Sequence, residues 1–197
     1  LRPDLVLVHA EQGKIVAQMR ALGIRTLALR NTTLEDTLRG IRETGEAVGL
    51  AERGVALEKE IRGRLAALAS RTSGRAPKKL LFIVGRTPGR LDGMLAVGKG
   101  SYLNELIRAA GGRNVLADSA VAYPRISLEG VLRMAPDVIV DMGDMAETVG
   151  VTEAHKESVR RLWGDVKARV FPVAADIFVV PGPRVVEAAE AFAEMML

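Results

Sequence analysis

The sequence contains no cysteine and few aromatic residues. The absence of cysteine excludes disulfide bonds and thiolate metal sites. Aromatic side chains make up 4% of the 197 residues, so a buried core must consist mainly of Leu, Val, Ala and Ile. No apolar run is long enough to cross a bilayer, and the chain opens on Leu1 without a basic and apolar leader. We therefore expect a processed or trimmed product with an aliphatic core.

A large excess of one charge is also missing. The 28 basic and 24 acidic residues give a formal net charge of +4, and basic residues alternate with Glu along the helical segments. An excess of this size favours anionic ligands or surfaces in general. The sequence has no basic stripe interleaved with aromatic residues, which is the pattern typical of nucleic-acid binding. We expect no nucleic-acid partner.

What is present is an alternation of short apolar runs and amphipathic helical segments. The runs have the composition of buried strands, and their alternation with helices predicts parallel α/β layers. A polar segment rich in Pro and Gly, residues 71–79, is the best linker candidate. The expected strands lie at 4–8, 25–29, 80–84, 137–141 and 169–173. The expected helix after residue 29 has Thr33 as its cap, and Pro183 is expected in the first turn of the last helix.

The segment before the linker predicts one long helix. Residues 51–72 repeat apolar side chains at helical spacing, which places them on a single stripe with charges on the other faces. The stripe consists of Leu57, Ile61, Leu65 and Leu68. On either side of this helix, LRPDLVLV (1–8) and RMAPDVIVD (133–141) share a Pro-Asp pair followed by an apolar strand. The echo indicates two related α/β lobes joined by one helix.

The expected fold is therefore α/β, with two Rossmann-like parallel-sheet lobes joined by a long α-helix. The boundaries are 1–50 for the remainder of the N-terminal lobe, 51–72 for the helix and 73–197 for the C-terminal lobe. The second copy of the echo is preceded by a strand, a helix, a loop and a helix (80–135), whereas nothing precedes the first copy. We infer that the chain lacks the start of its first lobe.

The glycine-rich segment GMLAVGKGS (93–101) resembles a phosphate-binding loop only in part. The motif matches at its glycines and at Lys99, but Gly100 stands where a magnesium-binding hydroxyl is needed. The preceding strand also ends near Val84, too far upstream to turn directly into the loop. We expect a mobile loop that leads into a helix near Ser101, where backbone N–H groups could face a ligand.

Histidine is too scarce to build a metal site. His9 and His155 are the only histidines and fall in different lobes, without the paired spacing that zinc or iron sites use. We expect neither a protein-built metal site nor a cofactor. His9 directly follows a strand, so it is a candidate to line a cleft.

Three acids follow the expected strand 137–141. Asp141, Asp144 and Glu147 lie at its carboxyl end, where α/β proteins bind ligands. Paired acids there could serve acid–base chemistry, but no G-x-S-x-G motif, nucleophile or partner base accompanies them. We expect no enzyme, and keep a small-molecule α/β enzyme that uses these acids as the alternative.

The stretch AVAYPRISLEG (120–130) is the strongest candidate for contact with a ligand. Tyr123 lies outside any periodic apolar pattern, beside a proline and Arg125, and tyrosine keeps a polar end for a wet site. Glu129 falls in the first turn of a helix that starts near Ser127, where an acid interacts favourably with the helix dipole.

Taken in order, four segments resemble the iron-siderophore, haem and cobalamin substrate-binding proteins of ABC importers. They are GKGSYLNELIRAAGGRNVLAD, YPRISLEGVLRMAPDVIV, WGDVKARVFPV and PGPRVVEAA, and the resemblance runs through nearly the whole chain. It implies two lobes that clasp a metal chelate (a siderophore, haem or corrinoid) in the cleft between them and deliver it to transmembrane permease subunits. The implied location is periplasmic or extracytoplasmic, either free or with a membrane anchor through a missing N-terminus.

The resemblance also assigns residues. Tyr123 matches a position where the family often places an aromatic against the ligand, and Asp176 and Phe178 lie in the matching loop after the last strand. Glu129 matches the glutamate of the C-terminal lobe that pairs with permease arginines. Val180 stands near the position where cobalamin binders carry a ligand-facing arginine, which weakens a cobalamin assignment and leaves a siderophore, haem or an oxyanion open. The full expected ligand-binding set is Tyr123, Arg125, Arg86, Ser101, Asp176, Phe178 and His9.

A third expectation concerns the chain on its own. If the first lobe is incomplete, its strands leave an unpaired sheet edge and apolar surface. The chain would then self-associate without a role in transport. The residues do not name the ligand.

Overall fold

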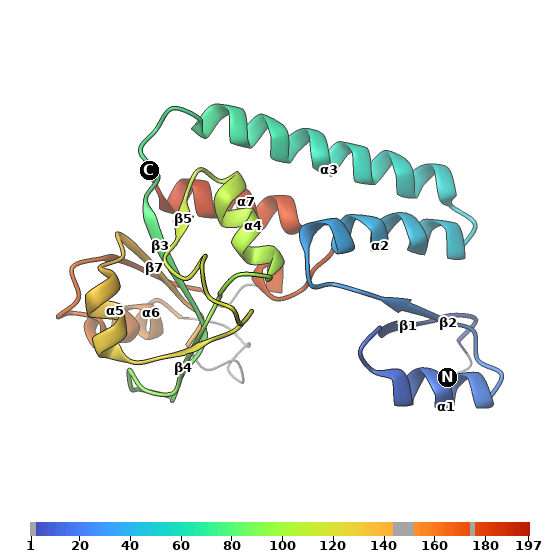
Figure 1. Ribbon diagram of the computed structural model, residues 1–197, viewed down its shortest axis with the longest axis horizontal. Coiled ribbons are helices and arrows are strands. Elements are labelled where there is room, and N and C mark those ends of the chain that lie inside the picture. Colours follow the sequence, from blue (N-terminus) through green and yellow to red (C-terminus); the bar gives the residue numbers. More distant parts are fainter. Residues whose placement is uncertain (1–2, 144–151, 174–175) are drawn as a thin grey trace.

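The apolar runs at the start of the chain form a small parallel sheet. The computed structural model describes residues 3–143, 152–173 and 176–197. Strand β1 pairs with β2 from Val6 opposite Thr26 to His9 opposite Leu29, and α1 crosses between them. The N-terminal elements are β1 (Val6–His9), α1 (Gly13–Ala21), β2 (Thr26–Leu29) and α2 (Leu34–Ala47). This N-terminal unit stands apart from the larger sheet in Figure 1.

Helix α2 begins at a complete capping box. The Asp36 backbone N–H donates to Thr33 Oγ1 at 3.0 Å, and the Thr33 N–H donates to Asp36 Oδ2 at 3.2 Å. Two of the N–H groups that a helix start leaves without partners are satisfied in this way. The predicted cap at Thr33 is confirmed.

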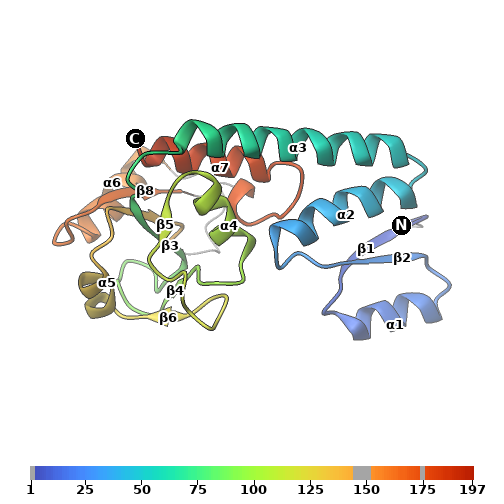
Figure 2. The same cartoon turned by 45° about the horizontal axis from the view of Figure 1, so that its top comes forward.

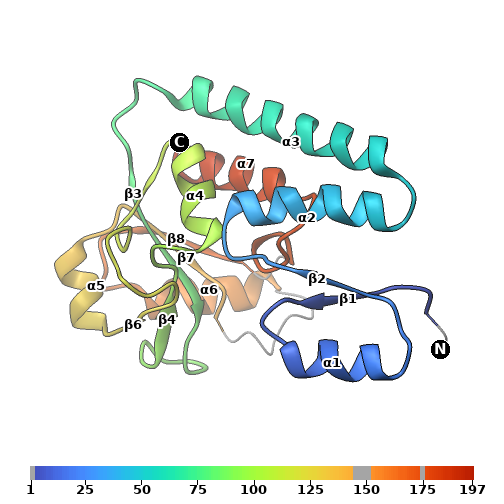
Figure 3. The same ribbon diagram turned by 45° about the vertical axis from the view of Figure 1, so that its right-hand side comes forward.

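Helix α3 (Ala51–Thr72) runs back along α2 and then over the C-terminal unit (Figures 1 and 3). Glycines allow the first contact, because a Cβ on Gly45 would lie only 3.0 Å from the Cα atom of Gly54. Further along, the predicted stripe supplies Ile61, Leu65 and Leu68 to a core that also contains residues of α4 and α7. A single helix therefore packs against both units.

The C-terminal unit is built on a six-stranded mixed sheet. Its main path runs β6-β4-β3-β7-β8, and β5 pairs with the start of β3. Strands β3, β5, β7 and β8 are parallel, whereas β4 and β6 add an antiparallel edge. The strands are β3 (Lys79–Gly85), β4 (Met94–Ala96), β5 (Arg113–Asn114), β6 (Arg125–Ile126), β7 (Val138–Asp141) and β8 (Arg169–Pro172).

Helices cover both faces of this sheet because β3 is apolar on both. Leu80 and Phe82 face the cluster that contains α4 and α7, while Leu81 and Ile83 face the cluster that contains α5 and α6. Successive side chains of a strand point to opposite faces, so the alternation follows from the pleat. The covering helices are α4 (Tyr102–Ala109), α5 (Leu128–Met134), α6 (Glu153–Leu162) and α7 (Val185–Met195). Figure 2 shows α3 and α7 side by side.

The α/β class and the long helix agree with the prediction from sequence, with two differences. Strands β4, β5 and β6 were not expected, because they are two or three residues long and lie within loop-like segments. Helix α7 begins at Val185, two residues after Pro183, which had been expected in its first turn. The division at 1–50, 51–72 and 73–197 stays a prediction. Within the described ranges, no helix has the length and apolarity that a membrane span requires.

Candidate ligand-binding site

The loop that carries Tyr123 is held against β4 and the residues after it. The Gly98 N–H donates to the Ala122 carbonyl at 2.8 Å, and the Ala96 N–H donates to the Pro124 carbonyl at 3.0 Å. A Cβ on Gly98 would lie 2.3 Å from the carbonyl oxygen of Val121, so only glycine allows this approach. The glycine-rich segment therefore allows the 119–124 loop to pack closely against it and does not form a phosphate-binding loop.

Ser101 links this loop to the start of α4. Its Oγ accepts from the Leu103 N–H at 3.3 Å as the N-cap of the helix, and lies 3.2 Å from the Tyr123 hydroxyl. Ser101 is buried, whereas Tyr123 is 41% exposed. The hydroxyl of Tyr123 is thus fixed at the helix start while much of its ring stays open to solvent. Ser101 acts behind the tyrosine, so its predicted direct contact with a ligand does not follow from this geometry.

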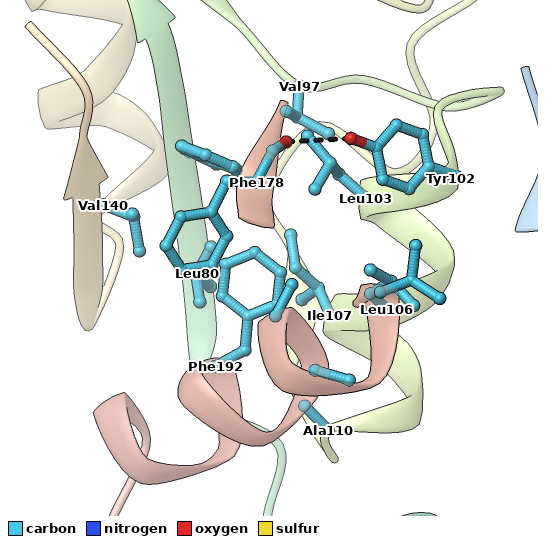
Figure 4. Packing of buried hydrophobic residues seen from close by; sticks show 14 of the residues in the cluster. Leu80, Val97, Tyr102, Leu103, Leu106, Ile107, Ala110, Val140, Phe178 and Phe192 are labelled. Atoms are coloured by element: carbon cyan, nitrogen blue, oxygen red, sulfur yellow. Dashed lines mark hydrogen bonds between the residues drawn. The ribbon is translucent and has the colours of Figure 1, made fainter. Parts of the chain in front are cut away.

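Tyr102 connects the loop that contains Phe178 to the start of α4. Its hydroxyl donates to the Phe178 carbonyl at 2.9 Å (Figure 4). Burial raises the pKa of Tyr102, and the nearby Tyr123 raises it further. The phenol is therefore neutral and remains a donor. Directly after Phe178, Val179 and Val180 are 40% and 52% exposed.

These contacts bring two loops to the start of α4, and we call the exposed residues of these loops the Tyr123 face: Val121, Tyr123, Val179 and Val180. Two adjacent residues connect the two loops. Ser101 contacts the Tyr123 hydroxyl, and Tyr102 donates to the Phe178 carbonyl. The 119–124 loop lies on the side of the C-terminal unit that is nearest to β1 and α1 (Figures 1 and 2). Val121 and Val179 were missed from sequence, and Val180 was noted only as a replacement for an arginine, although apolar residues in loops beside Pro were a usable signal.

Phe178 corrects one of the predicted ligand contacts. Its side chain is 2% exposed and packs with Phe82 and Phe192, at ring-centroid distances of 5.7 and 5.1 Å. Figure 4 shows it inside the cluster. The ring belongs to the core because the short helical turn Asp176–Phe178 folds it under the sheet, so only the main chain and the valines that follow can face a ligand.

Asp176 already has a partner. The Arg184 guanidinium donates a hydrogen bond to its carboxylate, and this bond holds the pKa of Asp176 below its usual range. Both side chains are exposed. The pair braces the turn against the start of α7, and a ligand that used Asp176 would have to displace Arg184.

Arg86 belongs to a buried network centred on Asp141. Arg86 Nε donates to Asp141 Oδ2 at 2.9 Å, and Trp163 Nε1 donates to the same oxygen at 2.6 Å. The Gly143 N–H donates to Asp141 Oδ1 at 2.7 Å. The side chains of Arg86 and Asp141 are 3% and 0% exposed. A buried ion pair that is fully hydrogen-bonded holds three segments together at the carboxyl end of the sheet.

This network corrects two expectations. Arg86 is a structural partner of Asp141 more than a free ligand contact, although it also lines a surface pocket of about 470 Å³ beside α6. Asp141 cannot act as an acid or base for an outside substrate, because three donors surround it and no side-chain surface is open. Asp144 and Glu147 lie outside the described residues.

The remaining predicted residues lie at three separate places. His9 ends β1 in the N-terminal unit and is partly exposed. Arg125 is exposed on the edge strand β6. From residue 121 onward exposed and partly buried residues alternate, and Tyr123 and Arg125 are both among the exposed ones. Glu129 lies in the first turn of α5 with its side chain 85% exposed, and accepts a hydrogen bond from Arg133 at 3.2 Å. The ligand and docking roles of all three stay predictions.

An apolar hollow of about 370 Å³ lies between the two units. It is bounded by β1, β2, the facing sides of α2 and α3, and the turn Pro181–Pro183 that follows Val180. Among its apolar lining residues are Leu7, Leu29, Ile41, Val48, Leu57 and Pro181. Within the described residues, no group of three or more His, Asp or Glu side chains could hold a metal ion.

Comparison with known proteins decides the family. Residues 1–168 match the model of a family described as periplasmic binding protein. The chain belongs to this family. The vitamin B12-binding protein of Salmonella typhimurium is 29% identical over 195 residues, which cover 96% of this chain and 68% of that protein. As a periplasmic binding protein, the chain binds a solute and is not an enzyme.

Solved structures agree with this assignment. The ABC-type Fe³⁺-hydroxamate transport system of Saccharomonospora viridis is 25% identical, with a TM-score of 0.74 over 98% of this chain and 69% of that one. The periplasmic haem-binding protein RhuT of Roseiflexus sp. RS-1 is 21% identical, with a TM-score of 0.75 over 99% of this chain and 77% of that one. At this identity the second likeness shows the fold alone. The α/β fold expected from sequence is thus that of periplasmic binding proteins.

Proposed function

We propose that this periplasmic binding protein binds a metal chelate (a siderophore, haem or corrinoid) for an ABC importer. The observation that carries the proposal is the Tyr123 face, a pinned tyrosine ring flanked by exposed valines. A large chelate with an apolar body and polar rim needs an amphipathic aromatic wall of this kind. The relatives described as binding vitamin B12 and transporting Fe³⁺-hydroxamate support the same ligand class.

A thermal-shift screen tests the ligand class. Ferric hydroxamates, haem and cobalamin are added one at a time to the full chain, and a ligand at one hundred times its Kd stabilises the fold by about 2.7 kcal/mol. We expect saturable stabilisation by at least one chelate. If none of the three changes the unfolding temperature, the proposal fails.

Tyr123 variants test the site. Tyr123→Ala should weaken binding at least about tenfold, because it removes a central aromatic anchor. Tyr123→Phe keeps the ring and should lose much less. Leu132→Ala is the matched control, because Leu132 is also an exposed apolar side chain, 52% exposed, and lies on α5 outside the Tyr123 face. Equal losses in the alanine variants at Tyr123 and Leu132 would contradict the assignment.

Delivery to the permease is proposed to use Glu129. Its carboxylate is exposed on a rigid helix start, as an electrostatic docking contact requires. Glu129→Gln should weaken binding to the permease in detergent and leave chelate affinity unchanged. Glu153→Gln is the matched control, since Glu153 is a first-turn acid of α6 with its side chain 80% exposed and a similar partner, Lys156. A loss of chelate affinity in Glu129→Gln would contradict a docking role.

Attachment to a membrane is part of the proposal, whereas self-association without a role in transport is its alternative. A relative from Bacillus subtilis, 26% identical, is named as an ABC transporter substrate-binding lipoprotein, which favours a membrane anchor upstream of the described residues. The two-stranded sheet favours self-association, because Leu7 is 50% exposed and β1 pairs only with β2 among the described strands. Light scattering over a range of protein concentrations should show a dimer or larger species, and a strict monomer would exclude it.

A further inference from the structure

One end of the C-terminal unit carries a group of seven cations. We call it the basic pole and define it as Arg71, Arg75, Lys78, Lys79, Arg113, Lys167 and Arg169. Three surface hollows connect its members: the first two share Arg75, and the last two share Lys78. Arg113 pairs with Lys79 across β5 and β3. The pole surrounds the amino ends of β3 and β8, where α3 and α7 also end (Figure 2).

The pole carries a local excess of positive charge. Five of its cations line the three hollows, together with three acids, Asp137, Glu190 and Glu194. Lys79 and Arg113 add two further cations beside them. The formal net charge of all 197 residues is +4, so the pole has the same sign as the chain as a whole.

Most of these cations are explained neither by an ion pair nor by a helix dipole. Within the described ranges, Arg71, Arg75, Lys78, Arg113 and Lys167 make no ion pair. Arg71 lies in the last turn of α3, where a cation offsets the helix dipole. The other four lie outside helices and are exposed, so the dipole does not account for them.

The acids nearby are partly engaged elsewhere. Glu190 accepts a hydrogen bond from Arg64 at 2.9 Å, and Asp137 accepts one from the Lys79 N–H at 2.7 Å. Arg169 donates to the Met195 carbonyl at 2.8 Å. The outward potential of the pole is therefore set by the unpaired cations, which repel each other across a shared surface.

We propose that the basic pole is a contact surface for anionic phospholipid headgroups. The pole has no exposed aromatic side chain on which a base could stack, unlike typical single-strand binders. Leu197 is the one large exposed hydrophobic residue among the residues that line its hollows, so it lacks the apolar centre of a protein–protein hot spot. A spread of unpaired cations without either feature fits the smeared negative charge of a membrane surface, where each Lys or Arg strengthens binding about fivefold.

Vesicle sedimentation tests this surface. The full chain is mixed with vesicles of phosphatidylcholine alone or of phosphatidylcholine with phosphatidylglycerol, at low and at physiological salt. We expect binding only to the phosphatidylglycerol vesicles, and weaker binding as salt shortens the Debye length from about 30 Å at 0.01 M to about 8 Å at 0.15 M. Absence of binding at low salt, or equal binding to both vesicles, would overturn the proposal.

Two triple variants with the same change in charge distinguish an effect of the pole on vesicle binding from an effect of net charge. Arg75→Glu, Lys78→Glu and Arg113→Glu together should lower vesicle affinity at least about 100-fold. Lys14→Glu, Arg20→Glu and Arg25→Glu change exposed, unpaired cations of the N-terminal unit by the same amount, far from the pole in Figure 1. This control should bind almost as the parent does. Equal losses in both variants would show that only total charge matters and would refute the pole.

Two further measurements test whether the pole needs arginine geometry and whether it prefers lipid to another polyanion. Arg75→Lys with Arg113→Lys should keep vesicle binding, because lipid headgroups need charge and not the bidentate fork of arginine. Thermal unfolding must show that each variant folds. Tighter binding to duplex DNA than to phosphatidylglycerol vesicles at the same salt would assign the pole to another polyanion and overturn the lipid proposal.

Discussion

The two units of this protein differ in how they are stabilised. The C-terminal unit has apolar clusters on both faces of its sheet, and Leu80, Phe82 and Phe192 are completely buried. In the N-terminal unit, α1 buries no residue and neither strand of its sheet is fully buried. Its buried hydrophobic residue, Leu38 on α2, joins the cluster of the C-terminal unit. The smaller unit thus depends on the packing of α2 for its stability, whereas the larger unit is stabilised by its own apolar clusters.

The strongest test of this difference compares a core residue with a strand residue. Phe192→Ala should lower the free energy of unfolding by about 3–5 kcal/mol, because it removes a ring packed against Phe82 and Phe178 and leaves a cavity. Leu7→Ala on β1 should change it by less than about 0.5 kcal/mol, since Leu7 is half exposed. Urea unfolding measures both. Similar costs would show that the units are equally well packed.

The contact between α2 and α3 allows a more selective test. Gly45→Val should cost about 1–3 kcal/mol, because its side chain would collide with the backbone of Gly54 and Leu50. Gly63→Val is the matched control in α3, where nothing lies within 4 Å of an added Cβ. Hydrogen exchange should quicken in β1 and β2 of the Gly45 variant and not in β3. Equal quickening in both sheets would mean that the units open together.

The cap of α2 gives the smallest expected effect. Thr33→Ala should cost about 1 kcal/mol and Ser73→Ala, after α3, much less. Burial acts to raise the pKa of Asp36, but hydrogen bonds from Thr33 and Arg39 outweigh it and lower the pKa. A lowered pKa means that Asp36 stabilises the fold above its unfolded-state pKa, and that this contribution is lost as pH falls through the folded-state pKa. Thermal unfolding below about pH 4 should therefore differ less between parent and Thr33→Ala than at neutral pH.

The prediction from sequence worked where the signal was local. Helix α3 follows from the spacing of Ile61, Leu65 and Leu68, and the cap at Thr33 follows from its own neighbours. Strands β4, β5 and β6 were missed because runs of two or three residues are too short to show a period. Each of these outcomes depends on residues close together in the chain.

The candidate site was predictable only in part, because its geometry depends on residues far apart in sequence. Tyr123 was singled out by its surroundings, but its bond to Ser101 spans 22 positions. Asp141 looked like a free acid until Arg86, 55 positions away, and Trp163 were found beside it. Phe178 sits in a loop by sequence and in the core by structure.

The most direct test of the proposed function is a crystal structure of the chain with the chelate that gives the largest thermal shift. The proposal expects the chelate to lie against the ring of Tyr123 and the side chains of Val179 and Val180, with the network around Asp141 unchanged. A chelate bound elsewhere, with the Tyr123 face still open to solvent, would contradict it.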